Sequence, residues 1–313
     1  MVGSDVCGHM GDASEQLCAR WTTLGAFSPF YRNHNTLGAS DQEFYRWNST
    51  TVAAKKAIEI RYRLLDYIYT AMYLQTVDGT PLLYPLFYLY ANDIKTFGIE
   101  LQYFYGKGLL VSPVTEEDTT RVSAYFPEGV FYDYYTHAPI EGKGAYITIN
   151  EVDYTSIPLH YRGGVVIPQR IEGAMTTTAL RKKDFELIVA INKEGKASGE
   201  LYLDDGISIK QNNTTLVKFE YELGKLQVSG EFGFASGVSI KRIIFLGVVE
   251  RPFSCSLDSR LMGWTHDSEI GKLVMEVDRP LKAGFEVTLS SRENAGSDLD
   301  KWLFTVQQDF KMV

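Results

Sequence analysis

Apolar positions in the first quarter of the chain recur with a helical period. Along Asn48–Gln75 they return every three or four residues, which predicts one long helix with a wide apolar face, capped by Ser49 or Thr50. A helix with such a face normally packs against a sheet. A shorter helical stretch is predicted over Asp12–Trp21. The two apolar stripes of the long helix are Ala54, Ile58, Arg61, Leu65, Ile68 and Met72, and beside them Ala57, Ile60, Leu64, Tyr67 and Ala71.

After residue 77 the pattern changes to short runs rich in β-branched and aromatic residues, separated by turn signals. This spacing favours antiparallel sandwiches over βαβ units, and the runs are too many for one sandwich. We therefore expect two sandwiches in series. The predicted strands are Leu82–Tyr90, Gln102–Tyr105, Leu109–Pro113, Ser123–Phe126, Ala145–Ile149, Tyr161–Ile167, Phe185–Ala190, Gly199–Leu203, Leu216–Tyr221, Lys225–Gly230, Ser239–Leu246, Leu273–Val277 and Phe285–Leu289.

These patterns divide the chain into four parts. Residues 1–77 form a helical part, residues 78–168 a proximal β-sandwich and residues 169–291 a distal β-sandwich. The break between the sandwiches is expected near Pro168, where a polar run interrupts the strand pattern. Residues 292–313 combine a polar linker with a short amphipathic stretch, and we expect a disordered tail there.

Composition excludes several classes of function. Apolar residues make up 45% of the 313 positions and charged residues 22%, which is typical of a folded protein and excludes intrinsic disorder. No window reaches the ~18 uninterrupted apolar residues of a membrane helix, so no membrane partner is expected. A net charge of -8 disfavours nucleic acid. Five His and three Cys are too few for a Cys/His zinc module, and we expect neither a metal nor another cofactor.

The N-terminal residues and the glycosylation triplets give a mixed signal about localisation. Residues 1–7 have no basic region and no apolar region of a signal peptide. Three triplets nevertheless fit N-glycosylation, at Asn48, Asn212 and Asn213. Such triplets also arise by chance. The mismatch suggests that the chain lacks its natural beginning.

The first 47 residues carry the densest group of chemically capable side chains. Asp5 follows a short apolar start, and barrel enzymes place functional carboxylates just past the end of a buried strand. An Asp in this position can equally cap a turn. Around His34, aromatic, guanidinium and amide groups crowd together, and such groups stack on sugar rings or donate to hydroxyls. A structural histidine bonded to the backbone is the alternative interpretation of His34.

Several motifs together resemble glycoside hydrolase family 31, in particular the secreted fungal α-glucosidases. The resemblance spans roughly residues 1–291. It implies the C-terminal part of a (β/α)8 barrel over residues 1–77, followed by the proximal and distal sandwiches. It also implies an α-glucosidase activity, that is, retaining hydrolysis of α-glucosidic bonds, on an α-glucoside or α-glucan substrate. The motifs are Gly3-Ser4-Asp5-Val6-Cys7-Gly8-His9, Leu17-Cys18-Ala19-Arg20-Trp21, Gly25–Asn35, Arg61–Leu65, Gly79-Thr80-Pro81, Pro85-Leu86-Phe87, Val111–Val114, Arg162-Gly163-Gly164 and Tyr202–Gly206.

The resemblance assigns roles to individual residues near the start of the chain. Asp5 and His34 are expected to hydrogen-bond glucose hydroxyls in the -1 subsite. His9 departs from the family, which usually has Phe or Tyr there, so we expect an altered contact with the sugar at this position. The expected supporting residues are Arg20, Trp21 and Arg32.

The resemblance also assigns the cysteines and the localisation. The family's secreted members join the positions of Cys7 and Cys18 in a disulfide, although two free thiols in a core remain an alternative. Cys255 is left unpaired and is expected to be a small buried residue. Localisation in the secretory pathway or outside the cell follows from the same resemblance.

The two catalytic carboxylates of the family are not found in this sequence. A retaining glycosidase needs a nucleophile and an acid about 5–5.5 Å apart. The family places them in Asp-Met-Asn-Glu and Trp-Thr-Gly-Asp segments, and neither occurs here. Asp204 and Asp205 are a tempting pair, but their place before Gly206 favours a turn. We therefore expect a C-terminal portion that is inactive alone and whose partner is the missing N-terminal half of the barrel.

That expectation has a structural corollary and a functional alternative. With only about two barrel strands, the apolar faces of Asn48–Gln75 and Leu24–Phe30 would lack partners. The alternative function is a non-catalytic glucan-binding or subunit-forming β-sandwich module, in which Tyr132, Tyr134 and Tyr135 would bind glucan or another chain. These tyrosines can also simply pack between sheets.

Overall fold

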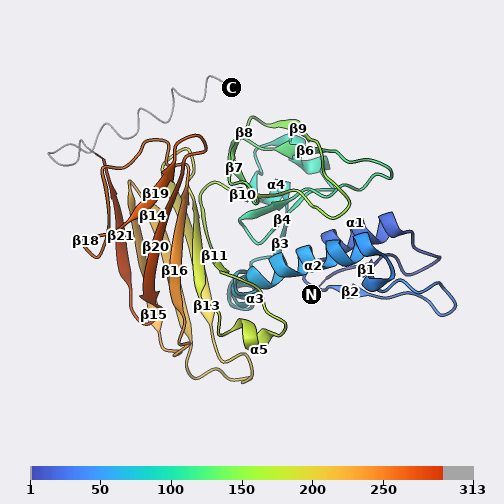
Figure 1. Ribbon diagram of the computed structural model, residues 1–313, viewed down its shortest axis with the longest axis horizontal. Coiled ribbons are helices and arrows are strands. Elements are labelled where there is room, and N and C mark those ends of the chain that lie inside the picture. The colour runs from blue at the N-terminus through green and yellow to red at the C-terminus, as the bar shows by residue number, and fades with distance from the viewer. Residues whose placement is uncertain (1, 292–313) are drawn as a thin grey trace.

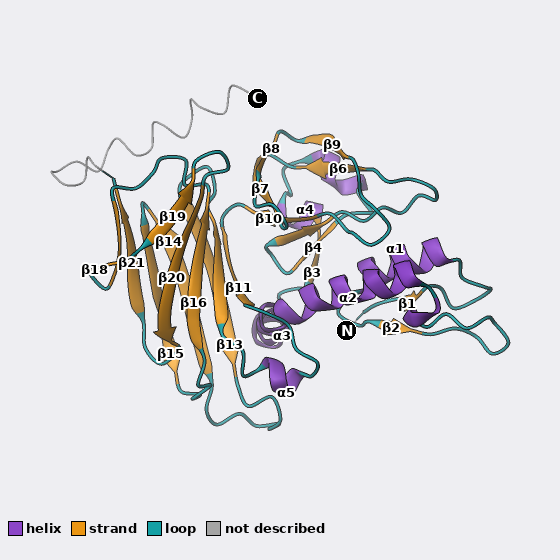
Figure 2. Ribbon diagram, in the orientation of Figure 1, coloured by secondary structure: helices purple, strands orange, loops and turns teal. Residues whose placement is uncertain are grey.

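The computed structural model describes residues 2–291; the tail expected over residues 292–313 lies outside the described residues. The described part has a helical region, a small sheet region and a large curled sheet (Figure 1). Colouring by secondary structure shows that strands dominate everything after the helical region (Figure 2). None of the helices among these residues has the length and apolar content needed to cross a membrane.

The helical region begins with α1 (Glu15–Gly25), which packs on α2 (Asn48–Arg63). Ser14 caps α1 by accepting a hydrogen bond from the Leu17 backbone N–H at 3.2 Å. The capping expected for the second helix was wrong. Trp47 occupies its N-cap without a side-chain bond, and the Ser49 hydroxyl donates to Glu15 at 2.6 Å, which ties the two helices together.

The single long helix predicted over residues 48–75 was also wrong, because two helices meet at Leu64. There α2 ends and α3 (Leu65–Asp78) begins, and Leu64 itself is fully buried, with φ -90° and ψ 4°. The bend lets α2 pack on α1 while α3 packs on two strands of the large sheet. Gly79 ends α3 in the left-handed conformation at φ 77°, which suits glycine.

The small sheet region covers the chain from Leu83 to Arg162. Within the described residues it contains a six-stranded sheet in the order β3-β4-β5-β10-β7-β8 and a separate β6-β9 pair. The strand predicted over Leu82–Tyr90 stops at Pro85, where the chain turns into the short helix α4 (Leu86–Leu89). The elements are β3 (Leu83–Pro85), β4 (Tyr103–Tyr105), β5 (Leu109–Val111), β6 (Val122–Phe126), β7 (Gly129–Asp133), β8 (Pro139–Gly142), β9 (Ala145–Ile149), β10 (Leu159–Arg162) and the 3-10 helices η1 (Phe44–Arg46) and η2 (Ile94–Gly98).

The large sheet has eleven strands among the described residues, in the order β18-β17-β21-β15-β14-β13-β11-β12-β16-β20-β19. Most neighbours are antiparallel, but β11 pairs in parallel with β13, and β12 with β16. The strands are β11 (Val165–Arg170), β12 (Phe185–Ala190), β13 (Lys196–Leu203), β14 (Thr215–Glu222), β15 (Lys225–Phe232), β16 (Ser239–Leu246), β17 (Ser254–Leu257), β18 (Arg260–Leu261), β19 (Trp264–Asp267), β20 (Lys272–Pro280) and β21 (Phe285–Ser290); the short helix α5 (Thr177–Leu180) follows β11.

The chain passes from the small sheet to the large one at Gly163–Gly164. The strand predicted over Tyr161–Ile167 is therefore two strands in different sheets. Gly164 has φ 97°, and a Cβ on Gly163 would lie 2.8 Å from the Val130 carbonyl oxygen, so only glycine fits this crossing. The division proposed at residue 168 stays a prediction, and β11 runs across it.

The two largest hydrophobic cores of the described residues hold these layers together. One fills the curled large sheet, as in a sandwich, and includes Phe185, Phe219 and Phe245. The other lies between the helices and both sheets. The apolar faces of Leu24–Phe30 and Asn48–Gln75 were expected to lack partners. That expectation was wrong for Phe27 and Ile60, which are buried in this second core.

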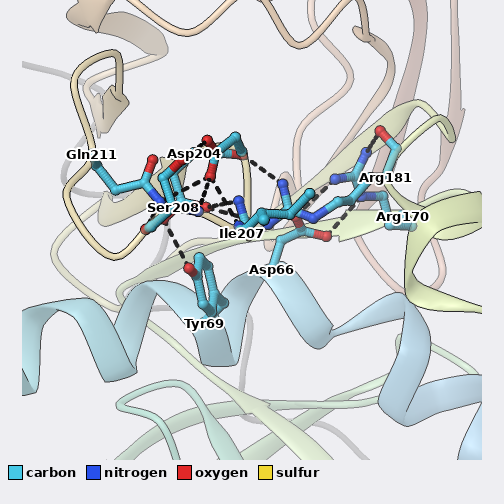
Figure 3. A network of polar contacts seen from close by, with 10 residues as sticks. Asp66, Tyr69, Arg170, Arg181, Asp204, Ile207, Ser208 and Gln211 are labelled. Carbon is cyan, nitrogen blue, oxygen red and sulfur yellow. Dashed lines mark hydrogen bonds and ion pairs between the residues drawn. The ribbon is translucent and has the colours of Figure 1, made fainter.

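A polar network joins α3 to the large sheet (Figure 3). The buried Arg170 guanidinium donates twice to Asp66 at 2.7 Å, and it stacks 3.9 Å from the Phe185 ring. The Tyr69 hydroxyl donates to Asp204 at 2.8 Å. These bonds satisfy polar groups that the packing of α3 against the sheet removes from water.

Candidate functional site

Two short strands near the start of the chain form a two-stranded parallel sheet. β1 (Asp5–Val6) pairs in parallel with β2 (Arg32–Asn33), with Asp5 opposite Arg32. The segments that follow both strands leave from the same edge, since parallel strands share a direction. That edge brings together side chains from two distant parts of the sequence.

Asp5 is held as a carboxylate by Arg32. The Nε and Nη2 atoms of Arg32 donate to Asp5 Oδ1 at 3.0 and 2.6 Å, and this bond holds the pKa of the Asp5 carboxyl below its usual value. Asp5 Oδ2 takes no part in that pair and lies 3.5 Å from His9 Nδ1. Asp5 thus presents one charged oxygen for further hydrogen bonds.

His9 and His34 complete the cluster beside Asp5. Their rings stack with centroids 5.1 Å apart and planes inclined by 29°. Both imidazoles are exposed, so the bonded structural histidine considered for His34 has no support here. The sequence-based roles of Asp5, His34 and His9 toward sugar stay predictions; the structure places these three side chains together.

The loops that carry the cluster are tied to each other by groups that sequence reasoning missed. The buried Gln42 side-chain nitrogen lies 3.1 Å from the Gly8 carbonyl oxygen and 3.0 Å from Asn33 Oδ1. The Thr36 backbone N–H donates to the His9 carbonyl at 2.8 Å. Gln42 sits in a polar, irregular stretch, where nothing in the pattern distinguishes it from a solvated loop residue.

A disulfide fixes the turn after β1. Cys7 is bonded to Cys18 of α1, as the resemblance implied. Cys7 has φ 72° and Gly8 φ 93°, so two consecutive left-handed residues turn the chain back over Asp5. Closing a loop of 11 residues stabilises the fold by about 2–3 kcal/mol. Cys255 is buried in the large sheet and is not bonded to another cysteine, and burial raises the pKa of its thiol to about 12.

Of the supporting residues proposed from the sequence, two lie at the site and one points elsewhere. Arg32 bonds Asp5, and the indole N–H of Trp21 donates to Ser4 Oγ at 3.3 Å. Arg20 instead donates to the carbonyl groups of Thr119, Val152 and Asp153 at 2.9, 2.8 and 2.6 Å. Any effect of Arg20 on the site therefore acts through the position of α1.

The two Asp residues before Gly206 have the turn role that the sequence favoured. Asp205 Oδ1 accepts the backbone N–H groups of Ile207 and Ser208, both at 2.9 Å. Asp204 accepts from Arg181 and from the Gly206 N–H at 2.8 Å (Figure 3). Both carboxylates are used in holding the loop after β13, far along the chain from Asp5.

The tyrosines proposed as a glucan-binding surface do not form one. Tyr132 and Tyr134 are only 2% and 6% exposed, because they pack between the small sheet and its neighbours. Tyr135 is half exposed, and its hydroxyl donates to the Ile157 carbonyl at 2.8 Å. Asn48, Asn212 and Asn213 are exposed, which a glycosylated asparagine requires; their glycosylation stays a prediction.

Comparisons with known proteins agree with this arrangement. Residues 1–71 match the family model of the glycosyl hydrolases family 31 TIM-barrel domain, and residues 79–167 match that of the family 31 C-terminal domain. A probable alpha/beta-glucosidase of Arthroderma benhamiae is 52% identical over 296 residues, covering 92% of this chain and 34% of the relative.

Solved structures give the same result for the fold. A glucosidase II alpha subunit bound to Glc1Man2 matches with a TM-score of 0.81 and 26% identity, covering 92% of this chain and 34% of the other. An ER glucosidase II heterodimeric complex, of a catalytic subunit and the binding domain of a regulatory subunit, matches with a TM-score of 0.81, 27% identity and the same coverage.

The chain thus spans about a third of the length of the relatives that it matches. Both family models fall where the sequence motifs predicted them, the first on the helical region and the second on the small sheet region. The chain belongs to glycoside hydrolase family 31, as a C-terminal portion that contains the end of the barrel and the β-sandwich region after it.

Proposed function

We propose that this chain forms the C-terminal portion of a retaining α-glucosidase and supplies one side of its -1 subsite. The observation that carries the proposal is the cluster of Asp5 and His34 at the shared edge of two parallel strands. The names of the relatives, probable alpha/beta-glucosidase and glucosidase II alpha subunit, support the same chemistry.

In this proposal Asp5 and His34 bind sugar and do not break the bond. Asp5 accepts hydrogen bonds from glucose hydroxyls through Oδ2, because Arg32 already occupies Oδ1. His34 offers a ring nitrogen to a neighbouring hydroxyl. Such charged hydrogen bonds orient the ring so that its anomeric carbon faces the nucleophile.

The nucleophile and the acid come from the part of the family's barrel that this chain does not span. The two would lie about 5–5.5 Å apart, as retention of configuration requires. The partner of this chain in solution is then the preceding portion of the barrel, whether joined to it or separate. The buried contacts of α1 and α2 with the sheets would hold β1 and β2 ready for that partner.

Localisation in the secretory pathway is part of the same proposal. The Cys7–Cys18 disulfide supports an oxidising compartment. The exposed asparagines of the three glycosylation triplets are consistent with passage through it. One of the matching solved structures is named as an ER glucosidase II complex.

The test combines this chain with a barrel portion from the Arthroderma benhamiae relative and measures p-nitrophenyl α-glucoside hydrolysis near pH 5. We expect no turnover from either part alone and turnover from the mixture. Asp5→Asn should lower kcat/KM by about 10- to 100-fold, the worth of one charged hydrogen bond. Asp41→Asn is the matched control, because Asp41 is an exposed carboxylate of the same region.

Two outcomes would overturn the proposal. A stable complex without turnover would mean that the cluster does not complete a glucosidase site. Turnover by the 313-residue chain alone that Asp5→Asn abolishes would mean that the catalytic pair lies within this chain.

A further inference from the structure

Three possible metal ligands converge at the edge formed by β1 and β2. One oxygen of Asp5 and one ring nitrogen each of His9 and His34 all lie within 4.8 Å of one another. Among the residues that the structure describes, this is the one group of three or more His, Cys, Asp or Glu side chains so placed. Two imidazoles and a carboxylate form a donor set that suits Zn²⁺ and similar divalent transition-metal ions.

We propose that Asp5, His9 and His34 bind a divalent transition-metal ion, with Zn²⁺ as the best fit, and that the ion excludes sugar from the same place. Metal binding is independent of the proposed function, and only the competition with sugar rests on it. The sequence analysis predicted no metal because it relied on the numbers of His and Cys, which reveal only zinc modules whose ligands lie close together in the sequence. They cannot show that two loops bring separate ligands together.

The loops hold the ligands near one another without a metal. The Thr36 N–H donates to the His9 carbonyl, so the segments after β1 and after β2 are bonded directly. The Gln42 side-chain amide donates to the Gly8 carbonyl and to Asn33 Oδ1, and so links the two segments a second time. Because the backbone is already in place, binding needs mainly side-chain rotation.

The remaining rearrangement is small. Bonds of about 2.0–2.2 Å to a tetrahedral zinc ion place its ligand atoms roughly 3.4 Å apart. His9 Nδ1 and Asp5 Oδ2 are already 3.5 Å apart, and the widest separation in the group is within 4.8 Å. His9 and His34 are exposed, so their rings can turn to close that gap.

Charge around the cluster leaves one side of Asp5 open to a cation. Arg32 donates only to Oδ1, and Oδ2 lies 3.5 Å from His9 Nδ1. The Arg32 charge opposes an incoming cation, so we expect a dissociation constant in the micromolar range and not tighter. A three-ligand site leaves a fourth position for water.

The proposed metal site requires His9, so a related chain with another residue at this position would not form it. Asp5 and His34 alone offer two ligands, which is too few for stable binding of a free ion. With His9 as the third, an ion would occupy the oxygen that the glucose hydroxyls need. Zinc should therefore inhibit a glucosidase that contains this chain, in competition with substrate.

The experiment titrates ZnCl2 into the tag-free, metal-stripped 313-residue chain at pH 7.5 by calorimetry. We expect one ion per chain. His9→Phe, His34→Asn and Asp5→Asn should each weaken binding at least tenfold, while Asp41→Asn should leave it unchanged. Long-range ¹H–¹⁵N spectra of the unmodified chain give a second readout, in which zinc should shift the imidazole nitrogens of two of the five histidines, His9 and His34.

The outcomes separate this inference from the proposed function. No zinc binding, equal binding by His9→Phe, or shifts at His137, His160 or His266 instead would overturn the metal site. In the reconstituted enzyme, zinc should raise the apparent KM without lowering kcat, and His9→Phe should remove that effect. If reconstitution yields no turnover but zinc binds through His9 and His34, the proposed function fails and the metal site stands.

Discussion

The ion pair between Asp66 and Arg170 predicts a large loss of stability when only one partner is neutralised. Arg170 is 2% exposed at its side chain and Asp66 is 12% exposed, and they share two hydrogen bonds of 2.7 Å (Figure 3). Asp66→Asn keeps the shape but leaves the buried guanidinium without a counter-charge. Breaking a buried pair in this way costs about 3–5 kcal/mol. Asp66 also lies in the first turn of α3, where a negative charge adds about 0.3–1 kcal/mol.

The control is a pair of the same type on the surface. Lys196 and Glu222 lie 2.6 Å apart with side chains 56% and 57% exposed, so Glu222→Gln should cost less than about 1 kcal/mol. Urea unfolding followed by tryptophan fluorescence gives both values. High salt should erase the effect of Glu222→Gln and leave that of Asp66→Asn, because a buried pair is poorly screened.

A double variant separates the cost of an orphaned charge from the worth of the pair. Replacing both partners with apolar residues, in Asp66→Leu/Arg170→Met, removes the unpaired charge and should be less destabilising than Asp66→Asn alone. The reasoning is refuted if Asp66→Asn falls within 1 kcal/mol of Glu222→Gln. It is also refuted if the double variant costs the sum of the two single changes.

Three further predictions concern stability. Burial lowers the pKa of His160 to about 4, so the folded chain excludes a proton that the unfolded chain binds below about pH 6.5. The contribution of His160 to the free energy of unfolding should therefore be complete above pH 6.5 and fall by up to about 3 kcal/mol toward pH 4. In urea unfolding at several pH values, His160→Gln should flatten that slope. Arg20→Leu leaves several carbonyl groups unpaired and should lower the unfolding free energy by about 2–4 kcal/mol in urea, whereas Arg121→Leu, at an exposed position, should change it by less than about 0.5 kcal/mol. Replacing Cys7 and Cys18 together with Ala should cost about 2–3 kcal/mol, seen as a lower Tm in a thermal scan that reductant no longer shifts.

The sequence predicts both alternating strands and continuous apolar runs, and β12, buried at every position, matches the predicted run Phe185–Ala190. β14 alternates buried and exposed positions along most of its length, and such a period of two is visible without any structure. β7 was missed because its apolar run is short and is bounded by Gly129 and Asp133, which are typical turn residues. The break at Leu64 left no trace in the sequence, since a buried leucine fits a continuous helix equally well.

The candidate site was predictable in its residues but not in its geometry. Asp5 and His34 came from a family resemblance over short motifs. The meeting of His9 with His34 depends on left-handed φ values at Cys7 and Gly8, and hydrophobic patterning carries no information about them. Gln42 was missed for the same reason, because its role depends on the Gly8 carbonyl and the Asn33 side chain that the fold brings beside it.

The sheets after the barrel end have a physical role in the site, through the loop that leads into β2. Arg61 of α2 donates to the carbonyl groups of Ala26 and Ser28, both at 2.6 Å. Tyr103 of the small sheet donates to the Phe27 carbonyl at 3.0 Å. This loop leads into Arg32, which holds Asp5, so a shift of the small sheet would move the Asp5 carboxylate. Helix α2 and the small sheet therefore help to position Arg32 and Asp5, through polar bonds as well as through apolar packing.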